Sequence, residues 1–347
     1  MKAVAFSIKP FEKEFMAKAN QKKHDITLIS NALSAETAAY AAGKDAVIVF
    51  TNDDVSEPVI EKLAALGIKF ILTRSVSTDH IDQKAAAKYG IKIANVPAYS
   101  PEATAEHAAA MAFALNRHIV KADKNSHHFD FRSDELMGFN FEGKTVGLIG
   151  LGNTGRAAAR IFNGLGCNVV GYDEHFPEDI PNVLSVKLAE LLAMSDIISL
   201  HIPLTKNTGY IINKATLDQM KHGVMLINTS RGGLINTKDL LMALDNRKVG
   251  YAGLDVYEYE RGLFFEDHEN DEIKDPLLKN LLDRPNVIIT PHQAYLTREA
   301  LQEIADQTIK NLDLWQQNKC LGDMCSCSKN CRHAQSNENQ NETTNVH

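Results

Sequence analysis

The segment TVGLIGLGNTGRAAARIFNGLGCNVVGYD, residues 145–173, restricts the fold of this chain more than any other feature. An apolar run leads into Gly150, Gly152 and Gly155 in G-x-G-x-x-G spacing, an alanine-rich stretch follows, and a second apolar run ends at Asp173. This order is typical of a strand, a tight turn, a helix and a second strand. Glycines in such a turn let the backbone approach a pyrophosphate at the helix N-terminus, where unpaired N–H groups favour anions. The glycine spacing alone would be weak evidence, but in this context it predicts a dinucleotide-binding unit.

The end of the second apolar run indicates which dinucleotide the chain binds. Asp173 stands eighteen residues after Gly155, where a carboxylate accepts hydrogen bonds from ribose hydroxyls. The same charge would repel the 2′-phosphate of NADP, and the next residues, Glu174 and His175, supply no Lys or Arg to accommodate it. The sequence therefore favours NAD over NADP.

Short apolar runs alternate with helical patterns on both sides of a break near residues 97–101. The first series contains the runs VAFSI, ITLIS, AVIVF, KFILTR and KIANV, and its helical patterns at 57–67 and 80–90 each end in glycine. The second series contains TVGLIG, NVVGYD, IISL, VMLINT, YAGLDV and NVIITP. This alternation predicts parallel strands covered by helices.

We therefore expect an α/β protein with two Rossmann-like or flavodoxin-like parallel-sheet domains and an active-site cleft between them. An alanine-rich helix of about four or five turns should follow the break. The final helical pattern is long enough to return to the first domain, so the expected domains are residues 1–100 with 298–320, and residues 101–297. The polar segment 321–347 has no aromatic residue and is predicted to be disordered.

The bulk composition excludes several classes of function. A length of 347 residues is consistent with two domains, and the net charge of −7 argues against a nucleic-acid partner. No apolar run reaches membrane length, and the first residues do not resemble a signal peptide, so we expect a cytoplasmic protein without a membrane partner. Cys167 stands alone in the body of the chain, which indicates a reducing compartment.

Three later strand ends carry side chains suited to redox chemistry on a keto acid. VMLINTSRGG carries Arg231, GLDVYEYERGLFFEDHEND carries a group of carboxylates, and VIITPHQAYLT carries His292. In parallel α/β sheets such loops gather at the carboxyl edge. The planar fork of an arginine suits a carboxylate and a ketone oxygen, a histidine suits proton transfer, and a carboxylate beside it would fix the imidazolium. Each residue alone has an ordinary structural explanation, so the prediction depends on their joint occurrence.

The motifs GLGNTGR, NTSRGG, GLDVYEYE, TPHQAYLT and NVPAYSPEATAEHA resemble those of the NAD-dependent D-2-hydroxyacid dehydrogenases. The resemblance covers about residues 1–320. Within this oxidoreductase family the chain is most similar to the fermentative D-lactate dehydrogenases. That similarity rests on AFSIKPFEKEF, the acidic insert ERGLFFEDHENDEIKDPLL and the aromatic residue in HQAYLT.

The resemblance implies roles for the strand-end residues. Arg231 would bind the substrate carboxylate and polarise the keto oxygen, and His292 would be the acid in reduction and the base in oxidation. Glu260 would be the partner of His292, and Asp255 would lie on the nicotinamide side of the cofactor. In an extended strand Glu258 and Glu260 point the same way, so strand geometry leaves both open and only the resemblance selects Glu260.

The resemblance also implies the remaining site residues. Backbone amides of Val76 and Ser77 would hold the substrate carboxylate, and Tyr99 and Tyr295 would line the pocket; many relatives have glycine at the position of Ser77. The implied cofactor residues are Gly150, Gly152, Asn153, Thr154, Gly155, Asp173, Ile202, Pro203, Thr208, Thr229 and Asp255. The first domain with the last helix would bind substrate, the second would bind NAD, and a homodimer or homotetramer would be usual.

The expected function is therefore that of a D-lactate dehydrogenase, which reversibly reduces pyruvate to D-lactate with NADH. Two alternatives are a dehydrogenase for another 2-keto acid and a non-enzymatic, NAD-sensing regulator. The tail contains potential zinc ligands, namely Cys320, Cys325, Cys327, Cys331 and His333. Their spacing is irregular and no strand or helix pattern surrounds them, so we expect no metal site.

Overall fold

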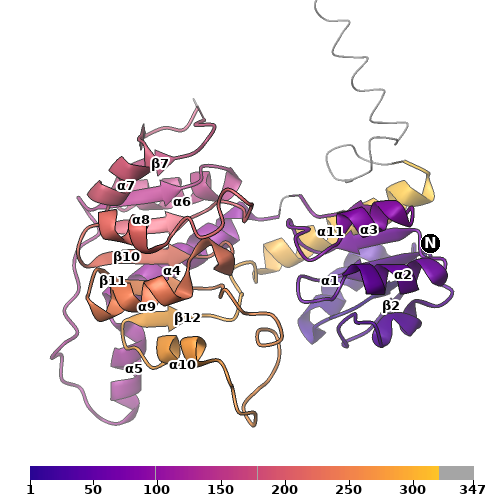
Figure 1. Cartoon of the computed structure of the whole chain (residues 1–347), viewed down its shortest axis with the longest axis horizontal. Coiled ribbons are helices and arrows are strands. Elements are labelled where there is room, and N and C mark those ends of the chain that lie inside the picture. The colour runs from indigo at the N-terminus through magenta and orange to yellow at the C-terminus, as the bar shows by residue number, and fades with distance from the viewer. Residues whose placement is uncertain (98, 178, 320–347) are drawn as a thin grey trace, which may run out of the picture. The chain divides into compact units, whose positions relative to one another are not determined.

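The computed structural model describes residues 1–97, 99–177 and 179–319 (Figure 1). The cysteine-rich and polar tail, for which disorder was predicted, lies outside the described residues. The described residues form two compact units, one of Met1–Ser100 with the chain from Thr297 to Lys319, and one of Pro101–Leu296. No helix in the described part of the chain is long and apolar enough to cross a membrane.

The first unit contains a five-stranded parallel sheet in the order β2-β1-β3-β4-β5. Its strands are β1 (Lys2–Ala5), β2 (Asp25–Leu28), β3 (Ala46–Val49), β4 (Phe70–Thr73) and β5 (Lys92–Ala94). Every residue of β3 is buried, because helices cover both faces of this sheet.

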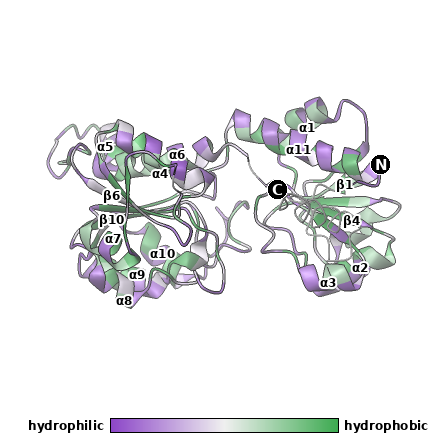
Figure 2. Cartoon of the chain, turned by 90° about the horizontal axis from the view of Figure 1, so that it is seen from above, coloured by the Kyte–Doolittle hydropathy of each residue, from purple (hydrophilic) through white to green (hydrophobic). Residues whose placement is uncertain are grey.

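Helices cover the two faces of this sheet with different apolar clusters. They are α1 (Lys13–Asn20), α2 (Glu57–Ala65), α3 (Gln83–Lys88) and α11 (Arg298–Gln316), with 3₁₀ turns at Pro10–Glu12 and Thr37–Ala41. Figure 2 shows α1 and α11 on one side of the sheet and α2 and α3 on the other. On the first side, Trp315 of α11 stacks on Phe70 with ring centroids 4.6 Å apart. On the other, Val59 and Ile60 of α2 pack with Ala85 of α3.

The second unit contains a seven-stranded parallel sheet in the order β12-β11-β10-β9-β6-β7-β8. Its strands are β6 (Thr145–Ile149), β7 (Asn168–Tyr172), β8 (Val183–Ser185), β9 (Ile197–Leu200), β10 (Val224–Asn228), β11 (Val249–Leu254) and β12 (Val287–Ile289). The chain order reverses at β6, which pairs with β7 on one side and β9 on the other. In open α/β sheets a ligand crevice forms at such a reversal, outside the carboxyl ends of the strands.

Helices also cover both faces of the second sheet. They are α4 (Pro101–Asn116), α5 (Ile119–His127), α6 (Asn153–Gly164), α7 (Leu188–Met194), α8 (Lys214–Gln219), α9 (Thr237–Asp245) and α10 (Pro276–Leu282), with a 3₁₀ turn at Gly232–Leu234. In Figure 2, α4 and α6 lie on one side of the sheet and α7, α8 and α9 on the other. The alanines of α4 allow α6 to pack closely, with Ala105, Ala108 and Ala158 in one buried cluster.

The predicted α/β class with two parallel sheets is confirmed, while some strand bounds differ. The run VAFSI was expected to be the first strand, but β1 ends at Ala5, and Ser7 has a left-handed backbone with φ of 53°. The second sheet has one more strand than the six predicted. The additional strand, β8, was missed because it is short and two of its three residues are exposed.

Candidate active site

The glycine-rich turn between β6 and α6 has the geometry expected of a dinucleotide site. Gly150 has φ of +97°, which an L side chain rarely adopts, and a Cβ at this position would overlap the carbonyl of His201. A Cβ on Gly155 would overlap the carbonyl oxygen of Gly150, so the helix can approach the turn only with glycine there. Gly152 is the N-cap of α6, no side chain caps it, and the space around its Cβ position is open. The first turn of α6 is thus available to an anion.

Asp173, directly after β7, is fixed beside this turn. Its Oδ2 accepts a hydrogen bond from the amide of Leu151 at 2.7 Å, and its Oδ1 accepts one from the amide of His175 at 2.9 Å. The carboxylate therefore holds the glycine-rich turn against the end of β7. It is half-buried, so part of it remains available to a ribose.

The loop after β9 contains Ile202, Pro203 and Thr208. The hydroxyl of Thr208 donates to the carbonyl of Pro203 at 2.6 Å and accepts from the amide of Thr205 at 2.7 Å, so Thr208 closes this turn. Thr229, directly after β10, is buried, and its Oγ1 has no hydrogen-bond partner among the described residues. A buried hydroxyl of this kind gains free energy if a ligand supplies its partner.

His292 and Glu260 are in direct contact. Nδ1 of His292 lies 3.0 Å from Oε1 of Glu260, and both side chains are partly exposed. Oε2 of the same carboxylate accepts a hydrogen bond from the amide of Tyr257 at 3.1 Å. With Nδ1 engaged by Glu260, Nε2 is the nitrogen that remains for a substrate. Phe265 lies beside the imidazole, with ring centroids 5.5 Å apart.

Asp255 organises the loop that carries His292. The side chain is completely buried, its Oδ1 accepts hydrogen bonds from the hydroxyl of Thr290 at 2.6 Å and the amide of Gln293 at 2.9 Å, and its Oδ2 accepts from the amide of Ala294 at 2.9 Å. These contacts hold the chain on both sides of His292, whose backbone is left-handed with φ of 53°. The predicted place of Asp255 beside the nicotinamide stays a prediction, whereas its contacts in the chain are those of a loop-positioning residue.

Glu258 has a different set of contacts from Glu260. It accepts hydrogen bonds from the hydroxyl of Tyr210 and from the amide of Thr237, the latter at 3.0 Å. Burial opposes ionisation, but these hydrogen bonds outweigh it and lower the pKa of Glu258. The hydrogen bond to Glu258 raises the pKa of Tyr210 to about 12. Glu258 therefore anchors two neighbouring loops, and Glu260 is the glutamate that contacts His292.

Arg231 follows β10 and begins the 3₁₀ turn at Gly232–Leu234. Its Nη1 donates to the carbonyl of Ser230 at 2.7 Å, and its own carbonyl accepts from Nδ2 of Asn228 at 2.9 Å. The next residue, Gly232, lies against the main chain of Tyr257, where any Cβ would overlap the carbonyl group. The loop of Arg231 and the loop of Glu260 are therefore packed backbone to backbone.

The three predicted catalytic residues follow three adjacent strands. The order β12-β11-β10 places the loops of His292, Glu260 and Arg231 side by side at the carboxyl edge of the second sheet. Tyr295 belongs to the same unit, three residues after His292, and is buried.

Val76, Ser77 and Tyr99 belong to the first unit. The carbonyl of Val76 accepts a hydrogen bond from Nδ2 of Asn95 at 2.6 Å, and that of Ser77 accepts from the hydroxyl of Ser75 at 2.7 Å. Within the described chain no group accepts from the amides of Val76 and Ser77. The loop thus has its carbonyls fixed and two amides available to an anion.

Comparison with known proteins places this geometry in a family. The model of the D-isomer specific 2-hydroxyacid dehydrogenase, NAD binding domain, matches residues 109–294. The chain is 44% identical to a D-lactate dehydrogenase of Curvularia clavata over 91% of this chain and 92% of that protein. The chain belongs to the D-isomer-specific 2-hydroxyacid dehydrogenases.

Two further relatives of this dehydrogenase support the assignment. The D-lactate dehydrogenase of Escherichia coli is 42% identical over 90% of this chain and 96% of its own length. A solved structure described as the pyruvate reductase of Chlamydomonas reinhardtii superposes with a TM-score of 0.88 at 40% identity, covering 93% of this chain and 98% of that one.

The cofactor of the dehydrogenase is NAD, and the residues present fit it. The open N-terminus of α6 behind Gly152 suits the pyrophosphate, and the half-buried Asp173 carboxylate suits ribose hydroxyls. The orphaned hydroxyl of Thr229, at the end of β10, can hydrogen-bond to a bound ligand.

Sequence reasoning missed residues that position the site of the dehydrogenase. His107 on α4 has its Nε2 3.0 Å from Oγ1 of Thr290 and 3.4 Å from Oδ1 of Asp255. Asn311 on α11 donates to the carbonyl of Asn95 at 3.1 Å and so supports the loop of Val76. His107 lies inside the motif NVPAYSPEATAEHA, which was a signal for it, whereas nothing in the sequence distinguishes Asn311 from other helix residues.

Proposed function

We propose that this dehydrogenase reversibly reduces pyruvate to D-lactate with NADH. The observation that carries the proposal is the hydrogen bond between Nδ1 of His292 and Glu260, on a loop held by the buried Asp255. It leaves Nε2 of an oriented imidazole to exchange a proton with substrate. The names of the Curvularia clavata and Escherichia coli relatives support lactate as the product.

Reduction of a 2-keto acid requires that its carboxylate is bound, its keto oxygen polarised and a proton delivered. NADH, when bound, supplies the hydride that reaches the keto carbon. We assign carboxylate binding and polarisation to Arg231, because a guanidinium can contact both groups through its planar fork. The proton comes from Nε2 of His292 in reduction and returns to it in oxidation.

Glu260 stabilises the charged imidazole and keeps its ring oriented, since the carboxylate contacts Nδ1 directly. We assign binding of the substrate carboxylate also to the available amides of Val76 and Ser77. The hydrogen bonds that the carbonyls of these residues accept hold the loop in place and support this assignment. Tyr99 and Tyr295 are proposed to limit the size of the substrate.

The alternative substrate class is a larger 2-keto acid. Discrimination by one methylene in an apolar pocket is worth only about 1–3 kcal/mol, so two tyrosines restrict the choice weakly. The non-enzymatic alternative has no observation in its favour, because Arg231, Glu260 and His292 are all present in a chain of a dehydrogenase family.

The decisive experiment measures initial rates with NADH for pyruvate, 2-ketobutyrate, phenylpyruvate, hydroxypyruvate and glyoxylate. We expect pyruvate to be among the best substrates by kcat/KM. A kcat/KM for phenylpyruvate that exceeds the pyruvate value by about tenfold or more, a difference of about 1.4 kcal/mol, would reject the lactate assignment in favour of a larger substrate.

We also propose a homo-oligomer in the cytoplasm. Three large apolar side chains in one segment of the second unit are strongly exposed: Phe129 at 84%, Phe131 at 76% and Met137 at 89%. A surface of this kind favours association between copies. Cys167, the one cysteine within the described residues, is buried and forms no disulfide, which agrees with a reducing compartment. Light scattering during gel filtration tests the oligomer, and a monomeric mass at micromolar concentration would exclude it.

A further inference from the structure

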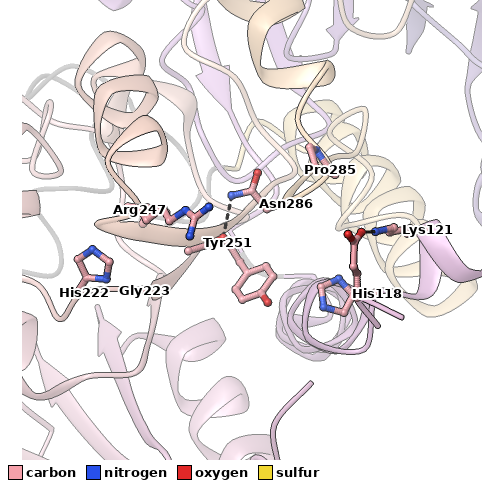
Figure 3. A pocket seen from close by; sticks show the side chains of 11 residues that line it. His118, Lys121, His222, Gly223, Arg247, Tyr251, Pro285 and Asn286 are labelled. Carbon is pink, nitrogen blue, oxygen red and sulfur yellow. Dashed lines mark hydrogen bonds and ion pairs between the residues drawn. The ribbon is translucent and has the colours of Figure 1, made fainter. Parts of the chain in front are cut away.

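A pocket of about 370 Å³ lies in the second unit at the amino ends of β10 and β11, the opposite end of these strands from Arg231 and Asp255 (Figure 3). It is formed by the residues before β10 and β12, the end of α9, the start of β11 and the start of α5. Its lining includes the side chains of His118, Lys121, His222, Arg247, Tyr251 and Asn286. Its volume falls within the roughly 300–1,000 Å³ of small-molecule sites.

The charge of this pocket is positive although the chain carries a net charge of −7. Lys121 is paired with Glu135, 2.6 Å away, and this contact lowers the pKa of the glutamate. Within the described chain, no carboxylate pairs with the guanidinium of Arg247, and no group hydrogen-bonds to the imidazole of His222. The neighbouring Asp245 is already engaged by Arg284, at 2.7 Å, so it does not neutralise Arg247.

The floor of the pocket is main chain. A Cβ on Gly250 would meet the carbonyl oxygen of Gly223 at 2.6 Å, so the start of β11 lies directly against the residue before β10. Here the register between the two strands shifts, between Val224 and Met225. Asn286 is the residue before β12, and its Nδ2 donates to the carbonyl of Gly250 at 2.8 Å, which fixes this floor. Gly223 has open space around its Cβ position, so a ligand can approach the backbone closely.

One wall of the pocket is aromatic. The rings of Tyr251 and His118 meet edge to face, with centroids 5.8 Å apart. Figure 3 shows the side chains of Arg247 and Tyr251 in the same pocket, with His222 on one side and His118 on the other. If the anionic group of a ligand bound to Arg247, the ring of Tyr251 would therefore offer an adjacent apolar surface to the rest of that ligand.

We propose that this pocket binds a small organic phosphate. The guanidinium of Arg247 and the imidazole of His222 hold the phosphate oxygens, and the carbon part of the ligand packs against Tyr251. A phosphate fits better than a single carboxylate because of its three terminal oxygens. Two of them can accept from the parallel donors of the arginine fork while the third accepts from an imidazole N–H, whereas a carboxylate has only two oxygens. The proposal does not depend on the identity of the keto acid.

The test is a calorimetric titration of the full chain with D-glucose 6-phosphate. Saturating NADH is present, so that the glycine-rich turn is occupied and does not bind the probe. We expect one saturable site per chain and a dissociation constant raised about tenfold or more in Arg247→Gln and in His222→Asn. The matched control is Arg160→Gln, an exposed arginine on α6 whose partner is Glu102, and it should bind like the unaltered protein.

Folding of each variant is checked by its thermal unfolding midpoint and by its turnover of pyruvate, which Arg247→Gln should leave unchanged. Absence of saturable heat up to about 10 mM probe would overturn the proposal, as would equal affinity in Arg247→Gln and the unaltered chain. Tighter binding of citrate than of D-glucose 6-phosphate, lost in Arg247→Gln, would reject the phosphate class.

Discussion

The main-chain amide of His292 donates a hydrogen bond to the carbonyl of Asp255 at 2.8 Å. The side chain of Asp255 then accepts from the two amides that follow His292, so a single residue holds the main chain before and after the imidazole. Left-handed φ values are uncommon outside glycine, and this set of hydrogen bonds is what maintains one at His292. Accurate placement of the imidazole therefore depends on Asp255.

Replacement of Asp255 by Asn should lower both stability and turnover. The amide nitrogen of Asn cannot accept from the donors that now contact the carboxylate, so at least one buried donor loses its partner, at a cost of roughly 1–3 kcal/mol. Urea unfolding measures this loss, and kcat for pyruvate should fall with it. Glu272→Gln, at an exposed position of the acidic insert, is the control and should change neither quantity. Stability equal to that of the unaltered protein would contradict the role of Asp255.

Replacement of Glu260 by Gln should reduce kcat by about 100-fold, because the neutral amide no longer stabilises the charged imidazole of His292. Glu258→Gln is the matched control, since Glu258 contacts Tyr210 and Thr237 instead. It should retain most of the turnover. The measurement is the steady-state rate of reduction and of oxidation for both variants. A larger loss of kcat in Glu258→Gln than in Glu260→Gln would assign the stabilisation of the His292 imidazole to Glu258. The affinity for NADH, measured by fluorescence, should stay within about twofold in both.

Replacement of Asp173 by Ser should shift the cofactor preference toward NADPH. Removal of the charge ends repulsion of a 2′-phosphate and removes an acceptor for ribose hydroxyls. The ratio of kcat/KM for NADPH to that for NADH should rise about 10-fold or more, mainly through KM. Loss of the hydrogen bond to Leu151 will also loosen the glycine-rich turn, so a lower rate with NADH is expected. An unchanged ratio would show that Asp173 does not select the cofactor.

His201 makes the stability of the protein depend on pH. Burial lowers the pKa of its imidazole from 6.5 to about 4, because the charged form would lose its hydration. The unfolded chain takes up a proton below pH 6.5 and the folded chain does not. The contribution of His201 to stability is therefore complete above pH 6.5 and is lost as the pH falls toward 4. Between pH 7 and pH 5 the loss is about 2 kcal/mol.

The His201→Gln variant tests this dependence, because its side chain can still hydrogen-bond to Ser199, which now lies 2.9 Å from Nε2 of the imidazole. Urea unfolding of both proteins at pH 7 and pH 5 should show a smaller decrease for the variant. Equal decreases would assign the pH dependence to other groups.

The sequence was sufficient to predict the class of fold, but it did not predict every strand or every backbone conformation. The run AVIV of β3 is recognisable because its residues are all buried. A parallel strand that helices cover on both faces has no side in contact with water, so its sequence is apolar throughout. The strand β8 was not predicted, since an edge strand with two exposed residues lacks that pattern. Ser7 and His292 illustrate a second limit, because their left-handed backbones are imposed by tertiary contacts and not by the residue type.

The choice between Glu258 and Glu260 shows where reasoning from strand geometry failed. That reasoning assumed an extended chain through both residues, but β11 ends at Leu254 and the chain then turns, with the amide of Glu260 3.3 Å from the carbonyl of Tyr257. The turn separates the two carboxylates and directs them to different partners. Contacts of this kind depend on loops that carry no periodic signal, so the resemblance to a family was the only guide to Glu260.

The division of the chain has a practical consequence for cloning. The polypeptide passes into the second unit once, after Ser100, and out of it once, after Leu296, so that this unit is an insertion within the first. A gene fragment encoding residues 101–296 therefore contains the glycine-rich turn, Arg231, Glu260 and His292 in one uninterrupted reading frame. The first unit is encoded by two separate segments, so a single gene fragment for it has to join the codon of Ser100 to that of Thr297, directly or through a linker.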